Sequence, residues 1–446
     1  MAETTSEFNE GVSSAIELET PLPQATVEEH QSSAQQGKAA AWWRGLSFAG
    51  PGALVAVGYI DPGNWATDIA GGSYAGYALL SIVLASSLVA MLLQIMSARL
   101  GIATGQDLAQ SSREAWPRFV WPAWIAAELS IIATDLAEVI GSAIALKLLF
   151  SIPIIIGVVL TTLDVLLILL LDRRGSPLLE RIIASFLFII ACGFIYEIAL
   201  AQPVIGDVLR GFVPTQRLAL DPQLLYLSIG VIGATVMPHN LYLHSNLVLQ
   251  RYSGTNKRKD SSFATFNTIV SLSGAMLLNS ALVVLAASVF HHAGHVDVTE
   301  LSDAHRLLTP LLGTSAAAIV FAVMLLASGQ SATITGTLAG QVVMSGYVRL
   351  HMKPWLRRLI TRMIALIPAL IAIAYFGERS TTHLLVGSQV FLSLQLPFAM
   401  VSLLILTSDR RRMGPLVNSN TMRWLGWLSA AIIVFANTAL IIELMH

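Results

Sequence analysis

The chain has 446 residues, of which 55% are hydrophobic and only 12% are charged. Soluble domains carry about 25% charged residues, so this composition excludes an ordinary soluble protein and indicates a chain that crosses a membrane several times. The single cysteine, Cys192, excludes an intrachain disulfide and a thiolate metal site.

Residues 1–42 are acidic and poor in apolar side chains, with Lys38 as a lone basic residue opposed by a series of glutamates: Glu3, Glu7, Glu10, Glu17, Glu19, Glu28 and Glu29. Such a segment cannot bury enough apolar surface to become ordered. It also lacks the basic and apolar regions of a signal peptide. We therefore expect a disordered cytoplasmic tail, followed by a transmembrane domain over residues 43–446.

Apolar stretches of about 20 residues or more, the length that spans a bilayer, recur along the whole transmembrane domain. They cover residues 47–73, 75–100, 119–147, 151–171, 178–201, 223–250, 263–290, 312–344, 355–376, 383–407 and 422–444. We therefore expect an all-α integral membrane protein with eleven transmembrane helices.

Basic residues gather in alternate loops between these spans, at 99–118, 172–181, 251–259, 349–353 and 410–412. Because Lys and Arg accumulate in cytoplasmic loops, we expect a cytoplasmic N-terminus and an external C-terminus in the plasma membrane. The sequence has no N-x-Ser/Thr acceptor for glycosylation, which favours a bacterial protein and hence the inner membrane.

Two proline-containing motifs interrupt the first and the sixth span: D-P-G-N from Asp61 and M-P-H-N from Met237. Proline breaks the helical hydrogen-bond pattern, and broken backbone within a membrane is tolerated only where it is buried in protein or faces a cavity. Equivalent breaks in two halves predict five-helix repeats at about 47–201 and 223–407, with 422–444 as an extra helix. An odd number of helices inverts the second repeat, an arrangement typical of secondary transporters.

The side chains at the breaks suit a transition metal. Asp61 offers a carboxylate, Asn64 an amide oxygen and Met237 a thioether, and we expect the unwound carbonyl groups of Gly58 and Ala234 to face the same gap. Mg²⁺ and Ca²⁺ prefer oxygen throughout, whereas a thioether suits softer ions such as Mn²⁺ and Fe²⁺. Two structural alternatives remain open: Asp61 can simply cap the following half-helix, and Met237 can simply pack in the core.

A second group of ionisable residues predicts a proton route from Asp61 to the cytoplasm. Three acids share one face of span three at positions i, i+7 and i+10: Glu128, Asp135 and Glu138. Charged groups at this depth need partners, and Arg357 and Arg358 at the start of span nine can supply them. His239 joins the route, because histidine in solution has a pKa near neutrality. Alternatively, His239 is a satisfied interior histidine, and one of the arginines only anchors its helix at the membrane surface.

Further polar residues leave the choice between function and structure open. Gln389 in span ten and Asn279 in span seven lie in apolar surroundings, where each can ligate metal transiently or bridge helices. An outer loop between spans seven and eight can collect metal or remain solvated, and its polar residues are His291, His292, His295, Asp297 and Glu300.

The two break motifs, together with residues 234–245 and the A-T-D-L-A-E sequence from Ala133, resemble the signatures of the Nramp family from about residue 43 to the C-terminus. The resemblance implies the LeuT-type fold with broken helices 1 and 6, and proton-coupled symport that imports Mn²⁺ and Fe²⁺ by alternating access. The metal is then a transported substrate, with no resident cofactor and no enzymatic activity.

The resemblance also implies roles for individual residues. The implied metal-binding residues are Asp61, Asn64, Met237, Gly58 and Ala234, joined by Gln389 in occluded states. The implied gate residues are Gln94 and Asn279, and the implied proton and charge network contains His239, Asp135, Glu138, Arg357 and Arg358. Two positions depart from the common family pattern, because Gly58 replaces an alanine and Ser87 replaces a frequent asparagine.

Two other function classes compete with a proton–metal symporter. A sodium-coupled carrier of organic solutes can use the same scaffold, but such a carrier would have no role for Asp61 or Met237 at the breaks. A membrane enzyme or metal-gated receptor is a third class, for which the sequence offers no paired haem histidines and no nucleophile constellation. We expect the lipid bilayer, metal ions and protons as partners, no nucleic acid, and a monomer.

Overall fold

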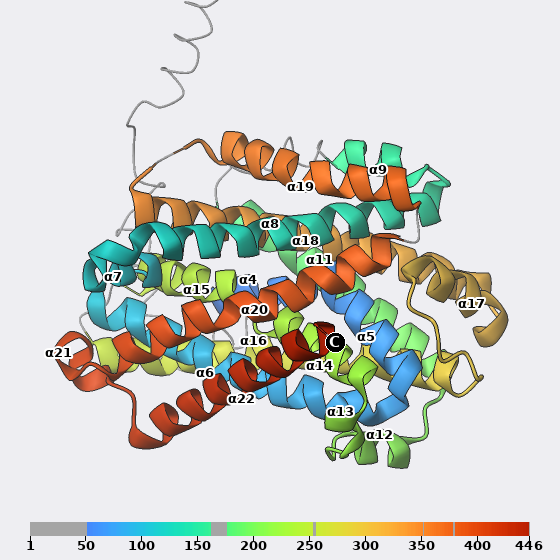
Figure 1. Ribbon diagram of the computed structural model, residues 1–446, viewed down its shortest axis with the longest axis horizontal. Coiled ribbons are helices and arrows are strands. Elements are labelled where there is room, and N and C mark those ends of the chain that lie inside the picture. The colour runs from blue at the N-terminus through green and yellow to red at the C-terminus, as the bar shows by residue number, and fades with distance from the viewer. Residues whose placement is uncertain (1–50, 162–175, 253–255, 351, 378–379, 446) are drawn as a thin grey trace, which may run out of the picture.

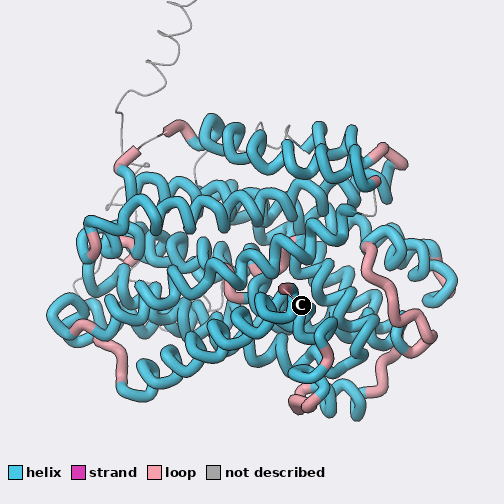
Figure 2. The backbone as a smooth tube through the Cα atoms, viewed as in Figure 1, coloured by secondary structure: helices cyan, strands magenta, loops and turns pink. Residues whose placement is uncertain are grey.

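In the computed structural model, the structure describes residues 51–161, 176–252, 256–350, 352–377 and 380–445. These residues are almost entirely helical, and the described part of the chain contains no β-strand (Figure 2). The predicted N-terminal tail, residues 1–42, lies outside the described residues.

The long helices follow the predicted spans. Those of the first repeat are α4 (Pro51–Gly58), α5 (Pro62–Ala75), α6 (Leu80–Thr104), α8 (Val120–Phe150), α9 (Ile154–Leu160) and α11 (Ser176–Ala201). Those of the second repeat are α14 (Pro222–Thr235), α15 (Pro238–Arg251), α16 (Lys257–Ala286), α18 (Ser315–Val348), α19 (Pro354–Phe376) and α20 (Ser380–Ser408). The predicted extra helix is α22 (Asn420–Leu444).

Within the described residues, nine helical stretches are long and apolar enough to cross a membrane. One of them, Pro62–Thr104, contains the second half of the first predicted span and the whole of the second. The fourth predicted span begins with α9 and continues into residues 162–175, which lie outside the described part. Within the described residues, the helices therefore agree with the predicted spans.

Shorter helices connect the spans: η2 (Gly76–Leu79), α7 (Leu108–Ala115), η3 (Pro117–Phe119), α12 (Ile205–Gly211), α13 (Arg217–Leu220), η5 (Ala287–His291), α17 (Leu301–Leu312), α21 (Arg410–Met413) and η6 (Gly414–Leu416). In Figure 1, α7 and α21 lie at one end of the bundle of long helices, and α12 and α17 lie toward the other end. Loops that the sequence assigns to opposite membrane faces are thus separated by the length of the spans.

The first and the sixth span are both broken where the sequence predicts. Asp61 is the N-cap of α5 in an extended conformation, and its Oδ1 accepts a hydrogen bond from the backbone N of Asn64 at 2.9 Å. Met237 is the N-cap of α15, also extended, and a proline follows each cap at the first helical position. Proline fits there because that position has no intrahelical N–H bond to lose. Asp61 and Met237 therefore occupy equivalent places.

The two broken helices run in opposite directions. The first half of the first broken helix, α4, packs against α15, which is the second half of the other. Conversely, α5 packs against α14. This antiparallel arrangement confirms the inverted repeat that the odd number of helices predicts.

Glycines and aromatic rings fix the half-helix α5 in the bundle. Pro62 lies against Gly141 of α8, where a Cβ atom would overlap the proline ring. Trp65 is fully buried, and its ring contacts Phe194 of α11 and Phe321 of α18 with centroids 5.3 and 5.2 Å away. Small residues that allow close helix contact are the usual basis of packing in membranes. The start of α5 is thereby held rigidly beside the break.

Candidate metal site

A single side-chain amide joins the two breaks. Asn64 donates through Nδ2 to Asp61 Oδ1 at 2.8 Å, to the carbonyl O of Tyr59 at 3.1 Å and to the carbonyl O of Ala234 at 3.1 Å. Asp61 and Asn64 are completely buried. The structure therefore brings the predicted ligands Asp61, Asn64 and Ala234 together at one point in the core of the bundle.

Several buried oxygen atoms around this point lack a hydrogen-bond partner among the described residues. They are Asp61 Oδ2, Asn64 Oδ1 and Gln389 Oε1. A Cβ atom at Gly63 would overlap the amide of Gln389 and lie 3.0 Å from Asp61 Oδ2, so both side chains flank this glycine. Buried polar groups are normally satisfied, and such oxygens suit a cation that binds between the breaks.

The second break repeats the local contact of the first. Asn240 donates through Nδ2 to Met237 Sδ at 3.4 Å, as Asn64 donates to Asp61 three residues before it. Asn240 also lies against Gly58, where a Cβ atom would come within 2.5 Å of its Nδ2. This contact gives a physical reason for glycine at position 58. Sequence reasoning did not select Asn240 as a site residue, although its equivalence to Asn64 was the available signal.

The predicted gate residues Gln94 and Asn279 meet at Tyr59, which sequence reasoning also missed. Asn279 donates to the carbonyl O of Tyr59 at 2.9 Å, and Gln94 donates to its hydroxyl group at 2.9 Å. His244 Nδ1 lies 2.9 Å from Gln94 Oε1 on the other side. The next carbonyl group, that of Ile60, accepts from the Ser328 hydroxyl. The carbonyl groups of Tyr59 and Ile60, which the break frees, are therefore satisfied by side chains, as a membrane interior requires.

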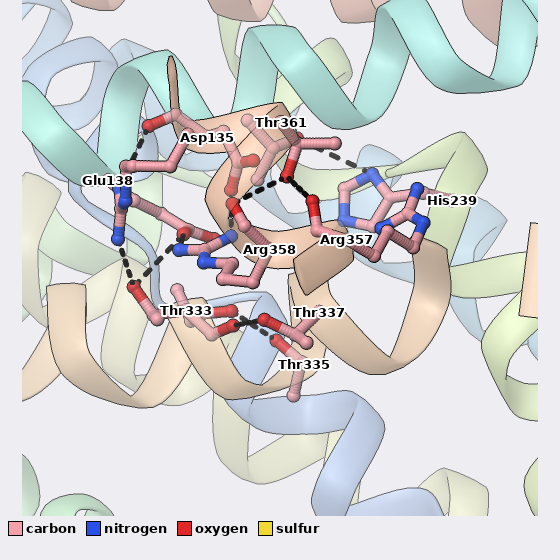
Figure 3. A network of polar contacts seen from close by, with 12 residues as sticks. Asp135, Glu138, His239, Thr333, Thr335, Thr337, Arg357, Arg358 and Thr361 are labelled. Atoms are coloured by element: carbon pink, nitrogen blue, oxygen red, sulfur yellow. Dashed lines mark hydrogen bonds and ion pairs between the residues drawn. The ribbon is translucent and has the colours of Figure 1, made fainter. Parts of the chain in front are cut away.

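The predicted acidic face of α8 meets the arginines of α19 (Figure 3). Arg357 Nη2 contacts the two carboxylate oxygens of Glu128 at 2.9 and 2.8 Å. Arg358 pairs with Asp135 and, at 2.8 Å, with Glu138. The exposed fractions of Arg357 and Arg358 are 3% and 1%, so neither reaches a surface, and the alternative of a membrane-surface anchor is wrong for both.

Glycines of α18 make room for this network, and a third arginine completes it. A Cβ atom at Gly340 would overlap the guanidinium group of Arg357. Thr333 of α18 donates to Glu138 Oε2 at 3.0 Å and accepts from Arg362 at 3.4 Å. Sequence reasoning missed Arg362, which is buried one helical turn after Arg358. Its spacing of four residues, which places it on the same helix face, was the available signal.

His239 lies at the edge of this network. It is 1% exposed, and its Nδ1 is 3.5 Å from Thr134 Oγ1, in the residue before Asp135. Within the described residues, no hydrogen bond or ion pair joins His239 to Asp61, so that segment of the predicted route has no direct contact. Among the other predicted members, Arg358 pairs with both Asp135 and Glu138, whereas Arg357 pairs with Glu128 instead.

The outer histidines do not assemble into a site. His291 Nδ1 lies 2.8 Å from the carbonyl O of Ser73, whereas His292 and His295 are exposed. The described part of the chain holds no group of three or more His, Cys, Asp or Glu residues placed to bind a metal. Ser87, the other departure noted in the sequence, is buried in α6.

Comparisons with known proteins agree with this geometry. Residues 52–443 match the family profile described as Natural resistance-associated macrophage protein-like, or Nramp. The chain is 52% identical over 404 residues to the divalent metal cation transporter MntH of Brucella suis biovar 1, covering 90% of this chain and 89% of that relative.

Solved structures are similar as well. The manganese transporter of Eremococcus coleocola, in complex with an aromatic bis-isothiourea substituted compound, is 39% identical with a TM-score of 0.84, covering 94% of this chain and 89% of that one. Mhp1, a nucleobase-cation-symport-1 family transporter, is 16% identical with a TM-score of 0.60, over 89% of this chain and 91% of that one. This second likeness concerns the fold alone, which is of the LeuT type.

Proposed function

The chain belongs to the Nramp family and is a divalent metal cation transporter, and from this premise we propose that it imports Mn²⁺, and also Fe²⁺, together with protons by alternating access. The observation that carries the proposal is the contact of Asn64 with both Asp61 and the carbonyl O of Ala234, which gathers donor atoms from both broken helices at one buried point.

In this proposal Asp61 supplies the negative charge and Met237 the soft sulfur. The carbonyl groups of Gly58 and Ala234 and the amide oxygen of Asn64 add neutral oxygens, and Gln389 joins them in the occluded state. Mixed oxygen and sulfur ligation favours Mn²⁺ and Fe²⁺ over Ca²⁺ and Mg²⁺, which prefer oxygen alone. Weak neutral ligands also suit a transporter, because the ion must leave again.

The ion pairs between α8 and α19 support coupling to protons. Ionisable groups this deep in a membrane protein are expensive and commonly mark proton relays. We assign His239, Glu138, Asp135, Glu128, Arg357 and Arg358 to the proton pathway. Coupling to protons adds to the driving force for metal import, since each positive charge that moves inward through 100 mV contributes about 2.3 kcal/mol.

We further propose that the protein is a monomer in the inner membrane of a bacterium, with residues 1–42 as a cytoplasmic tail and the C-terminus outside. The basic loops support this orientation. Arg113 of α7 and Arg410 to Arg412 of α21 lie at the same end of the bundle, which the positive-inside rule assigns to the cytoplasm (Figure 1).

A sodium-coupled carrier of organic anions fits the site less well. Such carriers hold a substrate carboxylate at the N-terminus of a half-helix. In this chain the N-terminus of α5 is capped by the carboxylate of Asp61, which would repel an anion. The same carboxylate attracts a cation.

Uptake into proteoliposomes tests the proposal. The purified protein is reconstituted with a metal-quenched dye and a pH dye inside, and Mn²⁺ is added outside under a clamped membrane potential. We expect dye quenching together with acidification of the lumen, and loss of both in Asp61→Ala. Mn²⁺ entry without acidification would contradict proton coupling, and absence of Mn²⁺ entry would contradict metal import.

A further inference from the structure

A second buried aspartate lies in the half-helix that begins at the first break. Asp68 belongs to α5 and follows Asn64 by four residues and the cap Asp61 by seven, a spacing that places the three side chains on one face of the helix. Side chains of a helix lean toward its N-terminus, so the Asp68 carboxyl group leans toward Asn64 and the break. Sequence reasoning did not select Asp68, although this spacing was the available signal.

Asp68 is completely buried and has no hydrogen-bond partner in the described part of the chain. Its exposed fraction is 0%, and neither Oδ1 nor Oδ2 accepts a hydrogen bond. The carboxylate of Asp61 is close enough for the two negative charges to repel each other. A carboxylate in such surroundings is costly unless a cation lies beside it.

The described helices that pack around α5 supply no such cation to Asp68. Neither α14 nor α18 contains an Asp, Glu, His, Lys or Arg residue. The charged residues of α16 are confined to its start at 257–260, and the histidine of α20, His383, is exposed. His291 of η5 contacts a backbone carbonyl group, and Arg306 of α17 forms an exposed ion pair within its own helix. The transported ion is therefore the cation that can balance this carboxylate.

The charges of the proposed metal site do not balance without Asp68. Asp61 is its one charged ligand, since the other proposed donors are amide, carbonyl and thioether groups, whereas Mn²⁺ carries two positive charges. The occupied site would keep one uncompensated charge in the core of the bundle, which is unfavourable where the dielectric constant is low. Seven residues of helix span about 10 Å, and Asn64 lies between the two aspartates. Asp68 is thus near enough to neutralise the second charge.

We propose that Asp68 supplies the second negative charge of the metal site and thereby makes the site favour divalent over monovalent ions. It acts on the ion through space and is not one of the ligands. The inference rests on the metal site proposed above and deepens it, because it names a residue that determines the charge of the accepted ion.

The size of the effect depends on the charge of the ion. Coulomb energy is proportional to that charge, whatever the dielectric constant. At about 10 Å and an effective dielectric constant of about 20, removal of the Asp68 charge should raise the Mn²⁺ dissociation constant at least about tenfold. For Ag⁺, a monovalent ion that suits a thioether, the factor should be the square root of that for Mn²⁺, or about threefold when Mn²⁺ loses tenfold. Distortion of the ligands would not follow this rule.

Metal binding to the purified protein tests the proposal without transport. Dissociation constants of Mn²⁺ and Ag⁺ are measured by calorimetry in chloride-free buffer. Asp68→Asn keeps the size of the side chain but removes its charge, and it should weaken Mn²⁺ binding at least about tenfold and Ag⁺ binding by the square root of that factor. The matched control is Glu197→Gln, which should change neither constant. Glu197 is also 0% exposed with both carboxylate oxygens unpartnered, but it lies on α11, away from the ligand face of α5.

A second variant and a second control make the outcome decisive. Asp68→Ala, whose methyl group needs no hydrogen-bond partner, should show the same two losses. An unchanged Mn²⁺ constant in Asp68→Asn would overturn the inference, and so would equal losses for Mn²⁺ and Ag⁺. Survival of Mn²⁺ binding in Asp61→Ala would instead overturn the proposed metal site itself. Loss of binding in Asp61→Ala together with unchanged binding in Asp68→Asn would overturn the role of Asp68 alone.

Discussion

Asn64 donates its side-chain amide to the carbonyl O of Ala234, 170 residues later in the chain, at 3.1 Å. The two residues belong to the two broken helices, which otherwise run in opposite directions through the bundle. Their contact means that neither half-helix can move without changing the donor atoms around Asp61. In the proposed function, alternating access and metal binding are therefore linked through the same few atoms.

Met237→Ala should change ion selectivity more than Mn²⁺ transport. Oxygen ligands remain in this variant while the proposed sulfur ligand is lost, so Ca²⁺ should be accepted. Uptake of Ca²⁺ and Mn²⁺ into proteoliposomes measures the change. Met324→Ala removes another fully buried methionine, which packs on Gly193, and should leave selectivity unchanged. Exclusion of Ca²⁺ by Met237→Ala would contradict the assigned role of the sulfur.

Gly63→Ala should weaken metal binding. The new methyl group would overlap the amide of Gln389 and crowd Asp61 Oδ2. Overpacking of this kind costs about 1–3 kcal/mol, and we expect the cost to appear as a higher Mn²⁺ dissociation constant in calorimetry. The matched control is Gly206→Ala, because a Cβ atom there has no neighbour within 4 Å. Equal affinities of the two variants would argue against the placement of Gln389.

Glu128→Gln should destabilise the protein strongly. It leaves the buried guanidinium group of Arg357 without its counter-charge, a change that costs about 3 kcal/mol or more. The apparent melting temperature in detergent measures the loss. Asp303→Asn breaks the exposed pair with Arg306, and such a pair contributes about 0–1 kcal/mol. If both variants melt alike, the pair between α8 and α19 contributes no more than an exposed one.

His239→Ala should alter the pH dependence of Mn²⁺ uptake while the Mn²⁺ dissociation constant stays similar, because its described polar contact is with Thr134 rather than with Asp61. Thr134→Val keeps the imidazole but removes this contact, and we expect a smaller change in the same direction. His383→Ala replaces an exposed histidine of α20 and serves as the control. A pH profile of His239→Ala that matches the unmodified protein would remove this residue from the proton pathway.

The sequence alone predicted the elements that depend on local chemistry. Span lengths follow from continuous apolar runs, and both breaks follow from the proline that comes directly after Asp61 and after Met237. The inverted repeat follows from counting spans between the breaks. The acidic face of α8 also follows from helical spacing, and the structure pairs each of its carboxylates with an arginine.

Only the tertiary structure decides which residue each of these side chains contacts. The sequence did not indicate that Asn64 binds the carbonyl O of Tyr59, that Gln389 lies against Gly63, or that Glu128 pairs with Arg357 rather than Arg358. These contacts join helices far apart in the sequence, and their geometry depends on how closely glycine-lined surfaces approach. A periodic pattern reports which face of a helix is buried, but the neighbour that fills that face is set by packing of the whole bundle.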